Sequence, residues 1–219
     1  MVPNRKHFDE DLKNLNLKVA NMGQEVINSY EKLISACINK DNNIANDIIE
    51  TDKYINEIEI SINVDAYLVI AKQCPVASDL RRIITALKIS NDLERIADYT
   101  VNIAKYLIKT KNDNEFFLKS IIELTTHVIV MLKDIMIAFE SEDITLALRV
   151  DEADDVLDEM YNKAIKQMIN IGTSKTDEES EEAIRTVLVL KQIERAGDHI
   201  TNIAENIVYL VNGKRVELN

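Results

Sequence analysis

Two stretches of the chain place acidic side chains one helical turn apart at matching positions. "LERIADYTVNIA" (93–104) carries Glu94 and Asp98, and "IERAGDHITNIA" (193–204) carries Glu194 and Asp198, 100 residues further on. Like charges four residues apart repel on a helix by roughly 0.2–0.5 kcal/mol per pair. An arrangement that is repeated despite this repulsion indicates a shared partner for the acids, either a cation or a set of ion pairs.

A second pair of motifs strengthens the pattern. "ANDIIETDKYINEIE" (45–59) aligns with "ALRVDEADDVLDEMY" (147–161), and each presents an Asp followed four residues later by Asp or Asn. In an antiparallel pair of helices these rows could face the Glu-x-x-x-Asp rows. The candidate metal ligands are Asp52, Asn56, Glu94 and Asp98 in the first half, and Asp154, Asp158, Glu194 and Asp198 in the second.

All eight candidate ligands offer oxygen, which favours hard cations: iron(III), Mn²⁺, Mg²⁺ or Ca²⁺. At 100° per residue the acids of 93–104 fall on the flank of the apolar stripe, so we expect them to be partly exposed. Ordinary surface ion pairs are the alternative, because Arg95 lies three residues from both Asp92 and Asp98. Such pairs contribute about 0–1 kcal/mol. The residues alone leave both interpretations open.

Weaker candidates accompany the acid rows. His199 follows Asp198 and could add a nitrogen ligand, or it could be an ordinary surface histidine. Glu123 and His127 lie four residues apart, although they have no counterpart in the other half. Each of these features has a purely structural interpretation that the sequence does not eliminate.

Two further charged features fall outside the repeated rows. Asp151 and Asp155 form another four-apart pair that the helical period places on a neighbouring, solvated face. Arg81 and Arg82 follow the start of an expected helix and could hold an anion or form salt bridges.

The elements that must position these residues are long helices. The chain has 219 residues, 46% of them hydrophobic, with only 4 Gly and 2 Pro to interrupt regular structure. The 3.6-residue period predicts an all-α fold of six helices, at about 6–38, 44–72, 76–109, 115–140, 144–171 and 177–211. The repeated motifs predict two tandem homologous three-helix bundles, residues 1–110 and 111–219, with antiparallel neighbours.

Charge and cysteine content narrow the class of protein. The net charge is −12, so binding to nucleic acid or to an anionic bilayer is disfavoured. Cys37 and Cys74 belong to no metal or redox motif, and no apolar leader or spanning segment is apparent. We expect a cytoplasmic protein.

The chain resembles the PhoU family, the accessory proteins of phosphate-specific transport. The resemblance covers nearly the whole chain and is carried by "NMGQEV" (21–26), "QCPVASDLRRIITALKISNDLERIADYTVNIA" (73–104) and "KQIERAGDHITNIAENIVYLVNGK" (191–214). It implies multinuclear metal clusters, iron in some members, held by the eight candidate ligands. Asn56 departs from the family pattern, and its neutral oxygen implies a weaker site or fewer ions in the first half.

The resemblance also implies a function. Members are cytoplasmic negative regulators, not enzymes, and they couple the phosphate ABC transporter to a sensor histidine kinase. By analogy, this chain would touch the membrane only through protein partners, and a homodimer is expected. Two alternatives remain. One is a structural helical protein with incidental metal. The other is a di-iron carboxylate enzyme, which is disfavoured because that class needs Glu-x-x-His and the chain contains none.

Overall fold

The computed structural model describes residues 5–73, 75–109, 115–172 and 177–218, and in these ranges it is entirely helical outside short connections. The helices are α1 (Arg5–Asn39), α2 (Asn42–Gln73), α3 (Ala77–Lys109), α4 (Glu115–Ser141), α5 (Ile144–Gly172) and α6 (Asp177–Asn212). The six ranges predicted from the hydrophobic period agree with these bounds to within two residues. Cys74 and the connections 110–114 and 173–176 lie outside the described residues.

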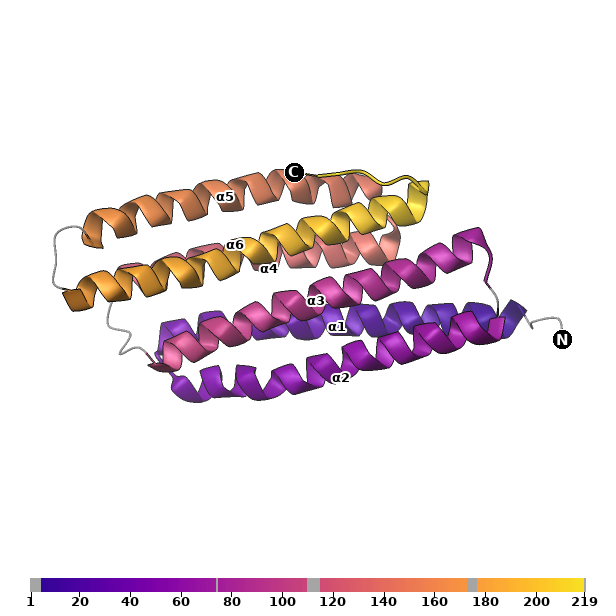
Figure 1. Ribbon diagram of the computed structural model, residues 1–219, viewed down its shortest axis with the longest axis horizontal. Helices are drawn as coiled ribbons and strands as arrows, with labels where there is room; N and C mark the ends of the chain where they lie inside the picture. The colour runs from indigo at the N-terminus through magenta and orange to yellow at the C-terminus, as the bar shows by residue number, and fades with distance from the viewer. Residues whose placement is uncertain (1–4, 74, 110–114, 173–176, 219) are drawn as a thin grey trace.

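The helices form two three-membered bundles packed side by side. Helices α1, α2 and α3 contact one another, and so do α4, α5 and α6. Contacts of α3 with α6 and of α1 with α4 join the two bundles, as Figure 1 shows. The predicted all-α tandem architecture is therefore confirmed, whereas the boundary between residues 110 and 111 stays a prediction.

The same kind of turn joins the first two helices of each bundle. Lys40 and Glu142 each adopt a positive φ, of 51° and 54°, and the following aspartate N–H reaches back to a helix carbonyl: Asp41 to Ala36 at 3.2 Å and Asp143 to Ala138 at 3.0 Å. Both aspartates then accept a hydrogen bond from a backbone N–H of the next helix, which caps it. These turns fix α2 against α1 and α5 against α4 in the same way.

The predicted apolar stripes form the core. In α3 the stripe is buried from Ile83 to Leu107, and in α6 from Ile193 to Ile207. Helix α3 also buries polar positions such as Ser90 and Thr100, because it packs against α6 as well as against its own bundle. Along the described ranges, each helix has too much charge or too little apolar length to traverse a bilayer.

A buried tyrosine fixes the height of α3 on α1. The hydroxyl of Tyr30 donates a hydrogen bond of 3.1 Å to the carbonyl of Ile96, which lies between Glu94 and Asp98. Complete burial and the nearby Tyr99 raise the pKa of Tyr30 well above its usual range, so the hydroxyl remains a donor. The contact therefore anchors the turn of α3 that carries the first acid pair.

Tyr30→Phe is expected to lower the free energy of unfolding by about 1 kcal/mol, because it removes one buried hydrogen bond and leaves the ring in place. Urea denaturation measures the change, with an unchanged m-value indicating an intact fold. Tyr54→Phe is the control, since Tyr54 is 54% exposed and should have little effect. Equal stabilities of the two variants would contradict the anchoring role of Tyr30.

Candidate functional site

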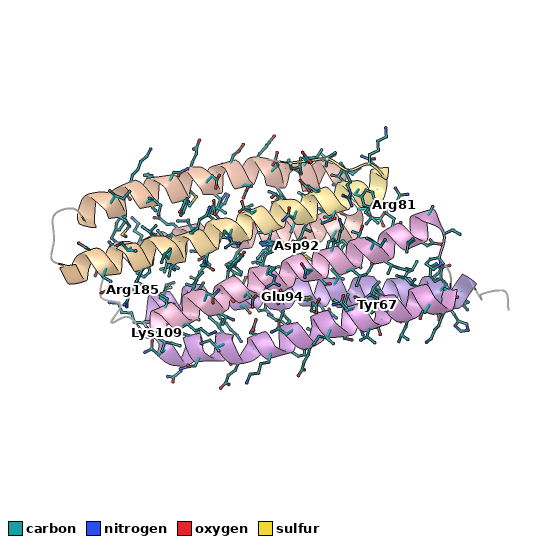
Figure 2. The ribbon with its side chains drawn as sticks, in the orientation of Figure 1. Tyr67, Arg81, Asp92, Glu94, Lys109 and Arg185 are labelled. Atoms are coloured by element: carbon teal, nitrogen blue, oxygen red, sulfur yellow. The ribbon has the colours of Figure 1, made fainter. Side chains whose placement is uncertain are left out.

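The first acid rows face each other across α2 and α3. We call Asp52, Asn56, Glu94 and Asp98 the N-terminal acidic group. Figure 2 shows Glu94 on the side of α3 toward α2, and Asp92 on the side toward α6. Burial first, and then the charge of Asp98, raise the pKa of Asp52; burial and Asp98 likewise raise the pKa of Glu94. The two helices thus bring the predicted residues into one electrostatic environment.

The second rows meet between α5 and α6 in the same manner. We call Asp154, Asp158, Glu194 and Asp198 the C-terminal acidic group. Burial, followed by the charges of the other three members, raises the pKa of Asp154 to about 7. Burial also raises the pKa values of Asp158 and Glu194, and the charge of Asp198 adds to both shifts. The juxtaposition expected from the repeated motifs is present in both halves.

Partial exposure is confirmed for Glu94 and Asp98, the two acids for which it is predicted. In the C-terminal acidic group two members lie deeper: Asp154 is only 4% exposed and Glu194 only 9%. The cause lies at Gly197: a Cβ added there would overlap Oδ1 of Asp154 and Cδ2 of Leu157. A bare helix surface on α6 therefore lets α5 pack closely enough to bury the carboxylate.

Unpartnered oxygens gather at the two groups. Among the described residues, seven buried side-chain oxygens have no hydrogen-bond partner. Five belong to or adjoin the groups: Asp52 Oδ1, Asn56 Oδ1, Glu94 Oε2, Glu194 Oε2 and Asp151 Oδ1. An unsatisfied buried polar group costs about 1–3 kcal/mol, so a cation or a hydrogen-bond donor would be most favourable at these two places. All five atoms are oxygens that accept and cannot donate, which fits the hard cation expected from the motifs.

The orientation of Asn56 fits this interpretation. Its Nδ2 donates a hydrogen bond of 3.2 Å to Oδ2 of Asp52, which leaves both Asn56 Oδ1 and Asp52 Oδ1 unpartnered. The amide therefore offers an oxygen in the row where the other half offers the carboxylate of Asp158. The neutral amide lowers the negative charge of the row and keeps an oxygen at this position.

A complete coordination sphere is not preformed. In the part of the chain that the structure describes, no three His, Cys, Asp or Glu side chains converge closely enough to hold one ion. The donor set and its unpartnered oxygens fit a hard cation, whereas the present rotamers spread the carboxylates apart. Repulsion between like charges accounts for this spreading, since a cation is what would draw such side chains together.

Cations of the chain itself already contact both groups. Arg95 lies 3.3 Å from Glu94 Oε2 through Nε and 3.3 Å from Asp98 Oδ2 through Nη1, but it is half exposed. Lys191 pairs with Oε1 of Glu194. The ion-pair interpretation is therefore correct for part of each group, although it leaves Glu94 Oε2 and Glu194 Oε2 without a hydrogen bond.

Sequence reasoning missed three residues at these groups. Asp151 was assigned to a solvated face, yet it has a buried oxygen and its charge raises the pKa of Asp154. Glu59 adds to the raised pKa of Glu94, and Lys191 bonds Glu194. A signal existed for two of them: Glu59 lies seven residues after Asp52, and Lys191 three before Glu194, both on the same face as those acids.

His199 takes no part in the C-terminal acidic group. Its Nδ1 lies 2.9 Å from Oδ1 of Asp92 on α3, and its ring packs against Tyr99 with centroids 5.8 Å apart. Arg195 lies 5.6 Å from the centroid of the same tyrosine. His199 is thus a contact between the two bundles, which contradicts the suggestion that it adds a nitrogen ligand.

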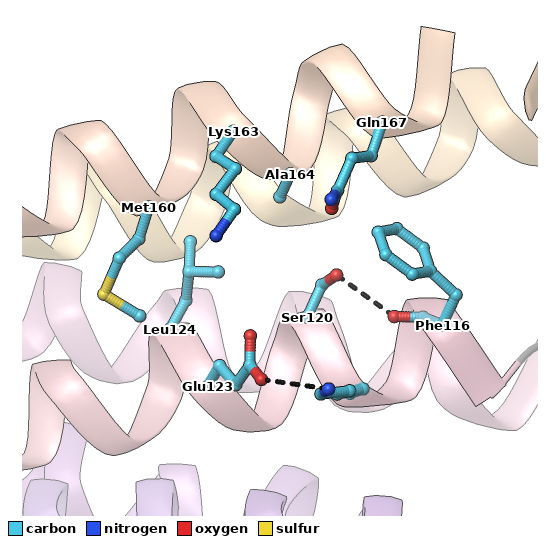
Figure 3. Close-up of a pocket in the computed structure, with 9 residues that line it drawn as sticks. Phe116, Ser120, Glu123, Leu124, Met160, Lys163, Ala164 and Gln167 are labelled. Carbon is cyan, nitrogen blue, oxygen red and sulfur yellow. Dashed lines mark hydrogen bonds and ion pairs between the residues drawn. The ribbon is translucent and has the colours of Figure 1, made fainter. Parts of the chain in front are cut away.

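Glu123 and His127 also do not form a metal pair. His127 Nε2 lies 2.7 Å from the carbonyl oxygen of Ala153, whereas Glu123 lies 3.7 Å from Lys119. Glu123 and Lys119 line a cavity of about 220 Å³ between α4 and α5. Figure 3 shows Glu123 there, with Ser120 bonded to the Phe116 carbonyl. No residue of either acidic group lines this cavity.

The two arginines at the start of α3 are structural. Arg82 forms two hydrogen bonds to the carboxylate of Glu142, the residue at the turn between α4 and α5. Arg81 lies 5.9 Å from the ring centroid of Tyr209, next to Gly213, whose φ of 70° ends α6. The salt-bridge interpretation holds for Arg82, and both side chains tie the bundles together.

In metal-free protein kept in chelator, Asp154→Asn is expected to raise stability above neutral pH. The folded-state pKa of Asp154, about 7, exceeds the ordinary value of 3.8, so its contribution to stability is complete below about pH 4 and is lost progressively as the pH rises to about 7. The stability of the variant relative to the parent should therefore rise by up to about 4 kcal/mol between pH 4 and pH 8.

Denaturation at several pH values measures this difference. Asp155→Asn is the control, because Asp155 is exposed on the same helix and its loss should shift stability little at either pH. A constant difference between Asp154→Asn and the parent from pH 4 to pH 8 would show that Asp154 is not a strained carboxylate.

The chain is similar to known proteins along nearly its whole length. The family profile of the PhoU domain matches residues 19–107 and again residues 121–207, one match in each bundle. The phosphate-specific transport system accessory protein PhoU homolog 1 of Thermotoga maritima is 34% identical, with 96% of this chain and 91% of that protein covered. For PhoU of Escherichia coli the identity is 32%, with 94% and 86% covered.

Solved structures agree with the sequence relatives. The crystal structure of the phosphate transport system regulatory protein PhoU from Streptococcus pneumoniae has a TM-score of 0.87 at 28% identity, covering 96% of this chain and all of that one. PhoU from Pseudomonas aeruginosa gives 0.88 at 29% identity, covering 94% of this chain and 100% of that one. These names describe accessory and regulatory proteins, not enzymes. With two domain matches and relatives along nearly its whole length, the chain belongs to the PhoU family.

Proposed function

We propose that this chain is a cytoplasmic accessory regulator of phosphate-specific transport that holds the phosphate-starvation response off when phosphate is ample. The observation that carries the proposal is the family match in both bundles, together with relatives named as accessory proteins of this transport system. In this role the chain links the phosphate ABC transporter to a sensor histidine kinase through protein contacts.

The surface offers means for such contacts. Helix α2 exposes an apolar row at helical spacing: Ile60, Val64, Tyr67 and Leu68, each at least 45% exposed. Exposed apolar rows of this kind mark sites where protein partners dock. The corresponding positions of α5 are Asn162, Lys166, Ile169 and Asn170, so only Ile169 remains apolar there and the continuous row belongs to the first bundle. Homodimer formation or attachment to the transporter would each cover such a row.

The proposal includes metal binding at the two acidic groups. Asp52, Asn56, Glu94 and Asp98 would hold cations in the first bundle, and Asp154, Asp158, Glu194 and Asp198 in the second. A bound hard cation, iron or alternatively Mn²⁺, Mg²⁺ or Ca²⁺, supplies positive charge that offsets the repulsion among the carboxylates. The residues contribute binding and orientation. Each acidic group spans two neighbouring helices, so a bound cation would fix α2 to α3 and α5 to α6.

Glu194→Gln combined with Asp198→Asn is expected to lower the bound metal per chain, because it removes two of the four side-chain ligands of one group and leaves their shape. Elemental mass spectrometry of protein purified without chelator measures the content. Glu123→Gln with Asp134→Asn is a matched control with the same charge change on α4. Equal metal content in all three proteins would remove the ligand assignment.

Deletion of the gene is expected to activate phosphate-starvation promoters in phosphate-rich medium, since a negative regulator would be absent. Reporter expression from such promoters measures the effect, and re-expression of the intact chain should restore repression. Promoter activity that is the same with and without the gene, at high phosphate, would leave the regulatory role without support and favour a structural protein.

A further inference from the structure

The two acidic groups differ at the position three residues before the glutamate, which decides whether a lysine bonds that glutamate. Lys191 lies one turn before Glu194 on α6, and the aligned position before Glu94 on α3 is Asn91. We infer that the Lys191 ammonium is a built-in competitor for the cation of the C-terminal acidic group, and that this group binds divalent metal only by displacing it. The inference rests on the proposed metal binding.

The position of the ammonium supports competition. Lys191 Nζ bonds Oε1 of Glu194, whose side chain is only 11% exposed, so the positive charge reaches into the buried part of the group. Its charge also offsets the repulsion that acts on Asp158. A cation and an ammonium ion that share Glu194 would repel each other.

A second contact could hold the Lys191 ammonium after it leaves Glu194. Lys191 Nζ lies 5.6 Å from the ring centroid of Tyr161 on α5, a cation–π distance. The side chain is 44% exposed, so it can leave Glu194 without losing either the ring or water. Displacement thus needs a change of rotamer and no movement of a helix.

The first bundle has neither the lysine nor the tyrosine at these two positions. Where the second bundle has Tyr161 and Lys191, the aligned positions of the first are Glu59 and Asn91. Glu59 adds negative charge beside Glu94. Lys105 favours the charged form of Asp52 through its charge. In the described part of the first bundle, the cation that contacts Glu94 is the half-exposed Arg95, and asparagine stands at the position equivalent to Lys191.

The test measures Mn²⁺ binding to the full chain after removal of metal with chelator. A background carrying Glu94→Gln and Asp98→Asn silences the N-terminal acidic group, so that binding reports the other group alone. In this background Lys191→Met should tighten the Kd for Mn²⁺ by at least about tenfold, because one competing charge is lost while the apolar stem remains. Electron paramagnetic resonance of free Mn²⁺ and titration calorimetry give the Kd.

Two control variants accompany Lys191→Met in the same background. Lys166→Met removes an exposed lysine of α5 with the same change of net charge, and it should leave the Kd within about twofold. Lys191→Arg keeps the charge and should bind like the background. If Lys191→Met fails to fold by circular dichroism, Lys191→Gln takes its place.

The outcomes separate this inference from the proposed function. If the background binds Mn²⁺ and Lys191→Met binds equally or more weakly, competition is wrong while metal binding stands. If neither protein binds Mn²⁺, and Asp154→Asn with Asp158→Asn changes nothing in the unsilenced chain, the metal-binding part of the proposed function fails together with the inference. Equal tightening by Lys166→Met would reduce the effect to net charge and would also overturn the competition.

Discussion

The main constraint on this molecule is repulsion among carboxylates. Neighbouring helices hold these carboxylates close together in a partly buried environment. Each bundle places oxygen donors of two helices within reach of one another, and burial raises the pKa values of Asp52, Glu94, Asp154 and Glu194. Desolvation raises the free energy of each ionised carboxylate, and the like charges nearby raise it further. The packing of the helices is favourable in spite of these groups and not because of them.

The molecule meets this constraint differently in its two halves. The first bundle uses a neutral amide, Asn56, and an exposed arginine, Arg95. The second keeps four carboxylates and adds Lys191 against the most buried glutamate. Since stability and ligand affinity are linked, unpartnered oxygens that destabilise the empty protein are the same atoms that would favour a cation. One set of side chains therefore sets both quantities.

The contact between the bundles gives these local sites a common frame. Asp92 on α3 bonds His199 on α6, and Arg82 on α3 bonds Glu142 at the turn after α4. Both contacts involve α3. Asp92 lies two residues before Glu94, and His199 directly follows Asp198. Helix α3 therefore belongs both to the N-terminal acidic group and to the interface between the two bundles.

Much of this could be predicted from the sequence, because helical period is a local property. The six helices, their turns at Lys40 and Glu142, the duplication and the acid rows all follow from residue type and spacing. Spacing fixes the angle of a side chain around its own helix, but not its depth below a neighbour. Burial of Asp154 above Gly197, the Asp92–His199 contact and the Lys191–Glu194 pair were decided by tertiary packing, since each depends on how closely a second helix approaches.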